Sequence, residues 1–207
     1  TDTFDVVIAN TNDAPTLATA QADETATEDT AYSVDVSGNF ADVDVGDTLT
    51  YTATGMPSTM TMSTAGVLSG TPLNADVGTS TVVVTATDGT ASITDTFDIV
   101  IANTNDAPTY SSADNAPDIS EGSTAVETIT VSDVDASESF TCSLGGNDAG
   151  SFSCTVTGSN VALAFSTAPD YDIAGDADAN NDYLVTLTIN DGDDDGSTIS
   201  YTISVTD

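Results

Sequence analysis

One stretch of the chain occurs twice, and the other features can be placed relative to it. Residues 94–109 repeat residues 1–16 with Ile99 in place of Val6 as the one difference, and the two copies lie 93 positions apart (102 − 9). This period is close to the roughly 100 residues of a single β-sandwich domain. Each copy ends in Asn, Thr and Asp followed by Ala-Pro, and proline cannot donate to a continuing strand ladder. We therefore interpret the repeated stretch as a strand followed by a joint between domains.

The repeat divides the chain into domains. Residues 1–10 are expected to be the closing strand of a preceding repeat, because their twin closes the first full domain. The other expected segments are a first domain at 11–102, a joint at 103–108 and a second domain at 109–207. The sequence begins in the middle of this pattern, so we expect it to be an interior part of something longer.

Both domains are predicted to be all-β. The 207 residues are 39% hydrophobic, and apolar residues alternate with polar ones in short runs without a helical stripe. The positions predicted to share a face in the first domain are Tyr32, Val34 and Val36, then Leu49, Tyr51 and Ala53, then Val82, Val84 and Ala86, then Phe97, Ile99 and Ile101. The second domain has strand-like runs around Ile129 and Val131, Phe140 and Cys142, Val161 to Phe165, Leu184 to Ile189 and Ile199 to Val205.

The charge balance excludes several classes of function. The chain has no Lys, Arg or His and has 34 acidic residues. Nucleic acid is excluded as a partner because phosphate binding depends on Lys and Arg, and no apolar run is long enough for membrane insertion. Catalysis would be confined to carboxylate chemistry, and we expect no enzyme. The acidic side chains repel one another, so positive charge must come from outside the chain, as divalent cations or as a salty medium.

Two cysteines, Cys142 and Cys154, flank a Gly-rich turn. A hairpin disulfide between adjacent strands is one interpretation, and it would indicate an oxidising compartment. Two buried thiols are the other.

Acidic residues recur at corresponding places in the two domains. Asp42 and Asp44 align with Asp133 and Asp135 at an offset of 91. The further matched pairs are Asp88 with Asp191 and Glu28 with Glu121. Several oxygen ligands from converging loops suit Ca²⁺, which takes six to eight of them, better than Mg²⁺. Any single Asp could instead be an ordinary turn residue, but the matched Asp-x-Asp pairs favour calcium.

These motifs resemble those of the cadherin repeat. The resemblance rests on Glu121, Asp133-Val134-Asp135, Asp170-Tyr171-Asp172, Asp191 and the joint Asn103-Thr104-Asn105-Asp106-Ala107-Pro108. The first domain, with Phe40-Ala41-Asp42-Val43-Asp44, Gly66-Val67-Leu68-Ser69-Gly70-Thr71-Pro72 and Thr87-Asp88-Gly89, is more similar to the dystroglycan-type cadherin-like repeats of large bacterial surface proteins. The resemblance implies tandem Greek-key β-sandwiches, cadherin-like and immunoglobulin-like, arranged end to end.

The resemblance also implies calcium ligands between consecutive domains. The central set would be Glu28, Asn103, Asn105, Asp106, Asp133, Asp135 and Asp191. An upstream set would be Asn12, Asp13, Asp42, Asp44 and Asp88, and Glu121, Asp170 and Asp172 would face a downstream neighbour. The chain departs from the family pattern in two places: Asn103 stands where an Asp is usual, and the first domain lacks the Asp-Arg-Glu motif, for which Asp76 is the nearby candidate.

The resulting functional hypothesis is a calcium-stiffened structural repeat, or extender, of a large extracellular bacterial adhesin or surface filament. Its expected partners are neighbouring repeats or copies of itself, with strand addition by residues 1–9 as one route. The alternative is a calcium-dependent polysaccharide-binding module, for which Tyr110 is the aromatic residue expected to be exposed. A carboxylate-pair glycosidase is disfavoured, because no aromatic subsite is indicated.

Overall fold

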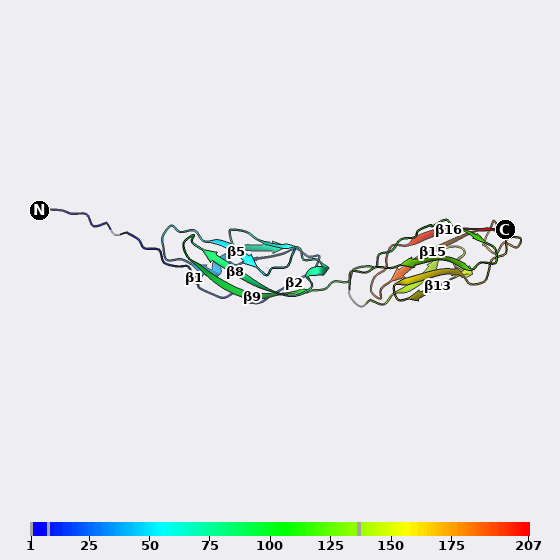
Figure 1. The fold of residues 1–207 in the computed structure, drawn as a ribbon, viewed down its shortest axis with the longest axis horizontal. Helices are drawn as coiled ribbons and strands as arrows, with labels where there is room; N and C mark the ends of the chain where they lie inside the picture. The colour runs from blue at the N-terminus through cyan, green and yellow to red at the C-terminus, as the bar shows by residue number, and fades with distance from the viewer. Residues whose placement is uncertain (1, 8, 136–137) are drawn as a thin grey trace. The chain divides into compact units, whose positions relative to one another are not determined.

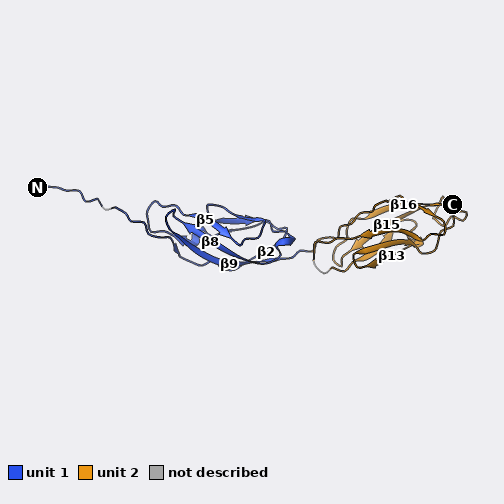
Figure 2. Cartoon of the chain, in the orientation of Figure 1, with its two compact units in different colours: residues 1–104 blue, residues 105–207 orange. Residues whose placement is uncertain are grey.

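The structure is a computed structural model that describes residues 2–7, 9–135 and 138–207. The chain forms two compact units, residues 1–104 (unit 1) and residues 105–207 (unit 2), which are coloured separately in Figure 2. Contacts thus assign residues 103–104 to unit 1 and residues 105–108 to unit 2. Each unit is described by itself below.

Unit 1 is a β-sandwich of a four-stranded and a three-stranded sheet. The larger sheet has the order β2 (Glu24–Thr27), β9 (Ser92–Ala102), β8 (Gly78–Thr87) and β5 (Thr50–Thr54). The smaller sheet has the order β3 (Tyr32–Asp35), β7 (Val67–Gly70) and β6 (Met60–Met62), and β1 (Thr16–Leu17) pairs with β4 (Phe40–Ala41). Two short 3-10 helices, Ser37–Asn39 and Asn74–Asp76, connect strands.

The long hairpin of β8 and β9 forms the centre of unit 1 (Figure 1). Val82 pairs with Phe97, and both are buried, at 0% and 2% exposure. Strand side chains alternate between faces, so the predicted inward set Val82, Val84, Ala86, Phe97, Ile99 and Ile101 is buried in one core. Strand β2 runs parallel to β9, an arrangement that sequence periodicity does not reveal.

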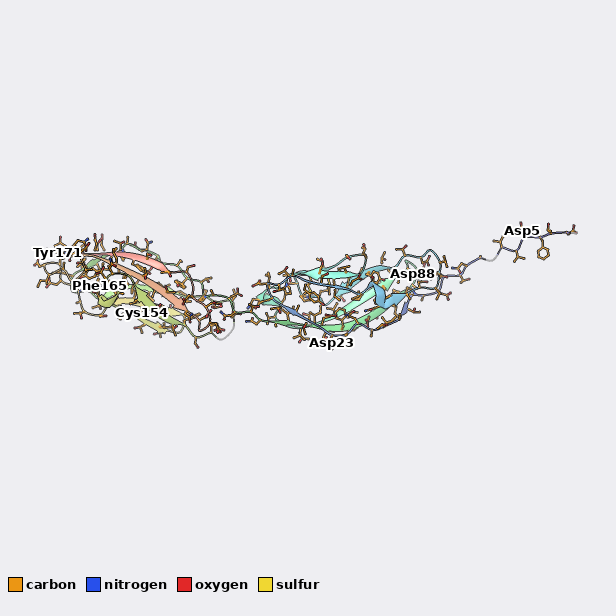
Figure 3. The ribbon with its side chains drawn as sticks, turned by 180° about the vertical axis from the view of Figure 1, so that it is seen from behind. Asp5, Asp23, Asp88, Cys154, Phe165 and Tyr171 are labelled. Atoms are coloured by element: carbon orange, nitrogen blue, oxygen red, sulfur yellow. A yellow bond between two sulfur atoms is a disulfide. The ribbon has the colours of Figure 1, made fainter. Side chains whose placement is uncertain are left out.

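Unit 2 repeats the plan with different side chains. Its larger sheet has the order β10 (Asp118–Ser120), β16 (Ile199–Thr206), β15 (Asp182–Asn190) and β12 (Thr141–Gly145), and β10 is parallel to β16. The smaller sheet has the order β11 (Ala125–Thr130), β14 (Asn160–Phe165) and β13 (Phe152–Thr157), with a 3-10 helix at Ala149–Ser151. Aromatic side chains pack together in the core of unit 2: Phe165 (labelled in Figure 3) lies edge-on to Tyr183 at a centroid distance of 5.0 Å.

Cys142 and Cys154 form a disulfide, with their Cα atoms 6.3 Å apart. The expectation of a hairpin bridge is wrong in its geometry: Cys142 lies on β12 in one sheet and Cys154 on β13 in the other. Strands β12 and β13 are edge strands of their sheets, so the bridge ties the two sheets together along one edge of the sandwich. Such a bond persists in oxidising compartments.

Residues 2–7 form no strand, and Phe4 is 84% exposed; Ile8 lies outside the described residues. The assignment of residues 1–10 to the closing strand of a preceding repeat stays a prediction. One further expectation needs correction. Tyr110, expected to be exposed, packs against the unit 2 core, and its hydroxyl oxygen accepts a hydrogen bond from the Ile189 N–H at 2.9 Å. The all-β prediction is confirmed. Within the described part of the chain, no helix has the length and hydrophobicity needed to cross a membrane.

Candidate metal centres

The first acidic cluster of unit 1 is built on the loop after β4. The Asp44 N–H donates to Asp42 Oδ1 at 2.9 Å, which closes a tight turn between the two aspartates. The Asp13 N–H then donates to Asp44 Oδ2 at 2.7 Å, and Asn10 Nδ2 donates to Asp44 Oδ1 at 2.6 Å. These bonds hold residues 10–13 against the loop, although the two segments are about 30 positions apart in sequence.

Asp88 joins the same end of unit 1 from the loop after β8 (labelled in Figure 3). Its Oδ1 accepts the N–H groups of Thr90 and Ala91 at 2.6 and 2.7 Å, and its Oδ2 accepts Asn12 Nδ2 at 3.1 Å. The backbone N–H groups of Ala91 and Thr90 lower the pKa of Asp88. The hydrogen bond from Asn10 does the same for Asp44, so both carboxyls are ionised at neutral pH.

Three carboxylates of this loop could hold one ion. Asp42, Asp44 and Asp47 each offer an oxygen, and these oxygens lie within 4.8 Å of one another. Asp42 Oδ2 is buried and has no hydrogen-bond partner among the described residues. A buried carboxylate oxygen without a hydrogen-bond donor is costly, and a cation bound at this atom would offset that cost. Asp47 is absent from the predicted ligands, although its alignment with Glu138 beside the Asp-x-Asp pair is a signal for it.

Unit 2 builds the same arrangement with its own residues. The Asp135 N–H donates to Asp133 Oδ1 at 2.9 Å, and the Asp106 N–H donates to Asp135 Oδ2 at 2.7 Å. Asn105 Nδ2 donates to Asp191 Oδ2 at 3.1 Å. Asp133 Oδ2 is buried without a hydrogen-bond partner in the described part of the chain, as Asp42 Oδ2 is in unit 1.

Asp191 is 5% exposed and is held by the turn that follows it. Its Oδ1 accepts the N–H groups of Asp193 and Asp194 at 2.9 and 2.8 Å, and the Asp194 N–H is the largest cause of its lowered pKa. Asn105 Nδ2 also lies 3.4 Å from Asp194 Oδ2, a second acid that sequence reasoning missed.

Glu138 completes the acidic lining of unit 2. Burial, followed by the charges of Asp191, Asp133 and Asp135, raises the pKa of Glu138. Asp133, Asp135 and Glu138 line a depression of about 400 Å³. The depression has room for a hydrated cation. The sequence contains no Lys, Arg or His that could neutralise its negatively charged lining.

The same network therefore occurs twice, and each copy brings together the predicted residues of its own unit. Unit 1 unites Asn12, Asp13, Asp42, Asp44 and Asp88, and unit 2 unites Asn105, Asp106, Asp133, Asp135 and Asp191. The atoms available as metal ligands are carboxylate, amide and backbone oxygens. This donor set suits a hard divalent cation that accepts six to eight flexible oxygen ligands, which describes Ca²⁺.

The remaining predicted ligands belong to the opposite ends of their units. In unit 1 the Thr104 N–H donates to a Glu28 carboxylate oxygen, and Asn103 Oδ1 accepts Asn74 Nδ2 at 3.4 Å. In unit 2, Glu121 Oε2 accepts the Tyr171 N–H at 2.9 Å. Tyr171 lies at one end of unit 2 (labelled in Figure 3), and Figure 1 marks the C-terminus at the same end.

Asp170 and Asp172 are exposed on the loop that carries Tyr171. The Asp172 N–H donates to Asp170 Oδ1 at 3.0 Å, which leaves the other carboxylate of this short turn facing solvent. Glu121 is exposed as well. The structure thus places Glu121 next to the Asp170 loop, through the backbone of Tyr171, and the role of all three as metal ligands stays a prediction.

Asp76, the candidate for the missing motif of the first domain, has a different role. Its carboxylate accepts hydrogen bonds from the Ser58 N–H and hydroxyl, the Thr59 hydroxyl and the Leu73 N–H, at 2.7 to 3.2 Å. The group caps the Asn74–Asp76 turn and ties it to the loop before β6. With both oxygens occupied by donors, it serves the fold.

A second acidic loop of unit 2 is also engaged by the backbone. Asp148, 6% exposed, accepts the N–H groups of Ala177 and Leu184 at 2.7 Å each. Asp176, 8% exposed, accepts the N–H groups of Asn180 and Asn181 at 2.9 and 3.1 Å. Sequence reasoning passed over both residues, and their hydrogen bonds assign them to shaping the loop before β15.

Comparison with known proteins agrees with this architecture. Residues 14–102 match the family model described as "Putative Ig domain". The structure of PcdhgB3 EC1-4 is similar at 23% identity and a TM-score of 0.62, covering 97% of this chain and 52% of that one. Protocadherin Gamma B2 extracellular cadherin domains 1-5 are similar at 19% identity and a TM-score of 0.61, covering 96% of this chain and 40% of that one.

An endo-fucoidan hydrolase from glycoside hydrolase family 107 aligns at 21% identity with a TM-score of 0.42, covering 96% of this chain and 30% of that one. At that TM-score the alignment carries no argument about chemistry. The chain spans about half or less of the length of these three structures. A search of the curated proteins finds no match. At these identities the structural similarities show the fold alone and do not identify metal ligands in this chain.

Proposed function

Because both units are cadherin-like β-sandwich repeats, we propose that the chain is a calcium-binding structural module, an extender, of a large extracellular adhesin or surface filament of a bacterium. The observation that carries the proposal is the network built twice, with Asp42 Oδ2 and Asp133 Oδ2 each buried and unbonded. The described residues offer no cation to either oxygen, because the sequence contains no Lys, Arg or His.

Calcium would act on stability and on flexibility in this proposal. An ion that binds the folded loops and not the unfolded chain stabilises by about 2.7 kcal/mol when its concentration is 100-fold above Kd. Ligands contributed by consecutive repeats would also favour the one arrangement that keeps them together. Glu28 and Asn103, and in the next repeat Glu121, Asp170 and Asp172, are the residues we propose for that second contribution.

The extracellular location is supported by the chemistry of the chain. The Cys142–Cys154 disulfide requires an oxidising compartment, and millimolar calcium is available outside cells. The likeness of the first domain's motifs to bacterial surface repeats supports the bacterial assignment. The polysaccharide alternative is not proposed, because Tyr110, its nominated aromatic residue, packs against the core of unit 2.

Thermal unfolding tests the proposal directly. The purified chain is melted in excess EDTA, in 2 mM Ca²⁺ and in 2 mM Mg²⁺ at fixed ionic strength. We expect a rise in Tm of about 5 °C or more with Ca²⁺, since 1 kcal/mol corresponds to roughly 4–8 °C for a domain of this size, and a smaller rise with Mg²⁺. Coincident melts in EDTA and Ca²⁺ would reject calcium binding.

Small-angle scattering tests the stiffening part separately. The same samples in EDTA and Ca²⁺ are compared for maximum dimension and for the spread of conformations that fits each curve. A narrower spread in Ca²⁺ supports a stiffened joint. Superimposable curves combined with a calcium-dependent Tm would leave calcium as a stabiliser of each repeat and remove the stiffening role.

A further inference from the structure

Residues 2–7 have the sequence of an interior β-strand, but no strand lies beside them. Phe4 and Val6 are 84% and 71% exposed, and the segment makes no strand pairing in the described residues. Its twin in β9 is central to unit 1, where Phe97 and Ile99 are 2% and 0% exposed. Phe4 and Val6 are two large apolar side chains separated by one polar residue, which is the spacing of a strand with one buried face.

The twin shows which contacts this sequence encodes. Asp95, the counterpart of Asp2, is 7% exposed and accepts the Gln21 N–H at 2.7 Å. Asp98, the counterpart of Asp5, accepts the Thr81 hydroxyl at 2.7 Å, and its own N–H donates to Asp23 Oδ1 at 2.9 Å. The polar positions of the strand are therefore as specific to the unit 1 fold as the apolar ones.

The sheet order of the described units shows what can receive such a strand. In unit 1 the place between β2 and β8 is already filled by β9, and in unit 2 the place between β10 and β15 is filled by β16. A folded second copy of the chain therefore has no vacancy for a strand of this sequence. The acceptor must be a sheet that has β2-type and β8-type strands and no closing strand of its own.

We infer that residues 2–7 are the closing strand of a further repeat of the unit 1 type in the same polypeptide, pairing parallel to its β2-type strand and antiparallel to its β8-type strand. The inference builds on the proposed function, since it makes the extender a series of such repeats. In the docked state Phe4 and Val6 occupy the positions of Phe97 and Ile99. Asp2 and Asp5 take the hydrogen-bonding positions of Asp95 and Asp98.

The test adds the missing acceptor to the full chain. A copy of residues 14–93 is fused directly before Thr1, which restores the order found at the junction of residues 93 and 94. Hydrogen exchange followed by mass spectrometry is then measured for residues 2–7 in the fused and the original chains. We expect protection in the fusion to rise by on the order of 1,000-fold or more, because exchange from an interior strand requires opening of the whole domain.

Matched variants separate strand docking from general effects. Phe4→Asp should abolish the new protection in the fusion and leave the Tm of the original chain unchanged. Ile99→Val converts residues 94–100 of the original chain into an exact copy of residues 1–7. That variant should fold with a Tm within about 10 °C of the parent, as expected for an Ile to Val change, which shows that the segment is competent as a closing strand.

Three results would overturn the inference. One is failure of the Ile99→Val chain to fold, and another is a fusion in which residues 2–7 exchange as fast as in the original chain. The third is concentration-dependent protection in the original chain, which would identify a second copy as the acceptor. The measurements are made in EDTA and in Ca²⁺, and protection in both would support the strand even if calcium binding were rejected.

Discussion

The backbone N–H of Asp13 donates to Oδ2 of Asp44 at 2.7 Å. The bond joins the segment before Pro15 to the loop after β4, so it positions one acidic segment over another within unit 1. Asp106 and Asp135 make the equivalent bond at the same distance within unit 2. Two independent sets of residues thus arrive at one geometry, which is the basis for predictions about each unit separately.

Substitution of the central aspartate should remove the calcium response of its own unit. Asp44→Asn acts on unit 1 and Asp135→Asn on unit 2, and each should reduce the Ca²⁺-induced stabilisation of that unit by at least about 1.4 kcal/mol, a tenfold loss of affinity. Hydrogen exchange resolves the two units in one sample. Asp5→Asn removes one charge from an exposed segment and serves as the control, and an equal loss in that variant would mean that net charge alone is responsible.

The disulfide should stabilise unit 2 without affecting unit 1. Cys142 and Cys154 are separated by 12 positions, and closing a loop of that size in the unfolded chain contributes about 3 kcal/mol in the chain-entropy model. The double variant Cys142→Ser, Cys154→Ser should therefore lower the free energy of unfolding of unit 2 by about that amount in urea titrations. Exchange from β8 and β9 of unit 1 is the internal reference, and a fall there would contradict the assignment to unit 2.

Asp76 should control part of the acid stability of unit 1. Burial opposes its charge, but hydrogen bonds from Thr59, Ser58 and the Leu73 N–H outweigh that effect and lower the pKa of Asp76 to about 2, from an ordinary 3.8. A carboxyl with a lowered folded-state pKa contributes stability that is complete above its unfolded pKa and is lost as pH falls through the folded value. We expect this loss between about pH 4 and pH 2.

The variant Asp76→Asn tests that assignment. It should be less stable than the parent at pH 7, and its stability should fall less steeply than the parent's between pH 4 and pH 2 in denaturant titrations. Asp35→Asn is the comparison variant. Asp35 lies on an exposed turn, and its carboxylate also accepts a backbone N–H, that of Ser37. Parallel pH profiles for Asp76→Asn and the parent would show that the hydrogen bonds at Asp76 do not set its titration.

Two glycines hold matching turns against the adjacent β-strand backbone. Gly55 has φ of +72°, and a Cβ there would lie 2.2 Å from the Thr81 carbonyl oxygen; Gly146 has φ of +93°, and its Cβ would lie 2.6 Å from the Leu184 carbonyl oxygen. Alanine at either position should destabilise its unit by about 2 kcal/mol or more, through backbone strain and the clash together. Gly38→Ala is the control in urea titrations, because an added Cβ meets nothing within 4 Å there; similar losses in all three variants would contradict the steric argument.

The all-β fold and the core were predictable from the sequence because strand periodicity directly reports which side chains are buried. Val82 and Val84, like Phe97 and Ile99, stand two positions apart and so share one face of their strand, and such a pattern buries that face in any sandwich that forms. The acidic pairs were predictable for a related reason. Asp42 and Asp44 recur as Asp133 and Asp135 at a constant offset, so the repeat itself marks them as more than isolated turn residues.

Other features depended on contacts between segments far apart in sequence. Local pattern could not place Cys142 and Cys154 in different sheets, because a Gly-rich turn between strands can close a hairpin or cross a sandwich. The burial of Tyr110 against unit 2 and the hydrogen bonds that engage Asp76 were likewise invisible to periodicity.

The sequence by itself determined that this chain is a tandem of acidic β-sandwich repeats, because composition, alternation and an internal repeat are local properties of the chain. Only the tertiary structure decided which acids act together. Asp88 approaches Asn12, and Asp191 approaches Asn105, across 76 and 86 positions. Such contacts form only when the strands that carry these loops have paired, so they depend on packing of the whole domain. Phe4 and Phe97 have identical neighbours in sequence, yet Phe97 is buried because β9 pairs with β2 and β8, whereas Phe4 is exposed because residues 2–7 pair with no strand of the described residues.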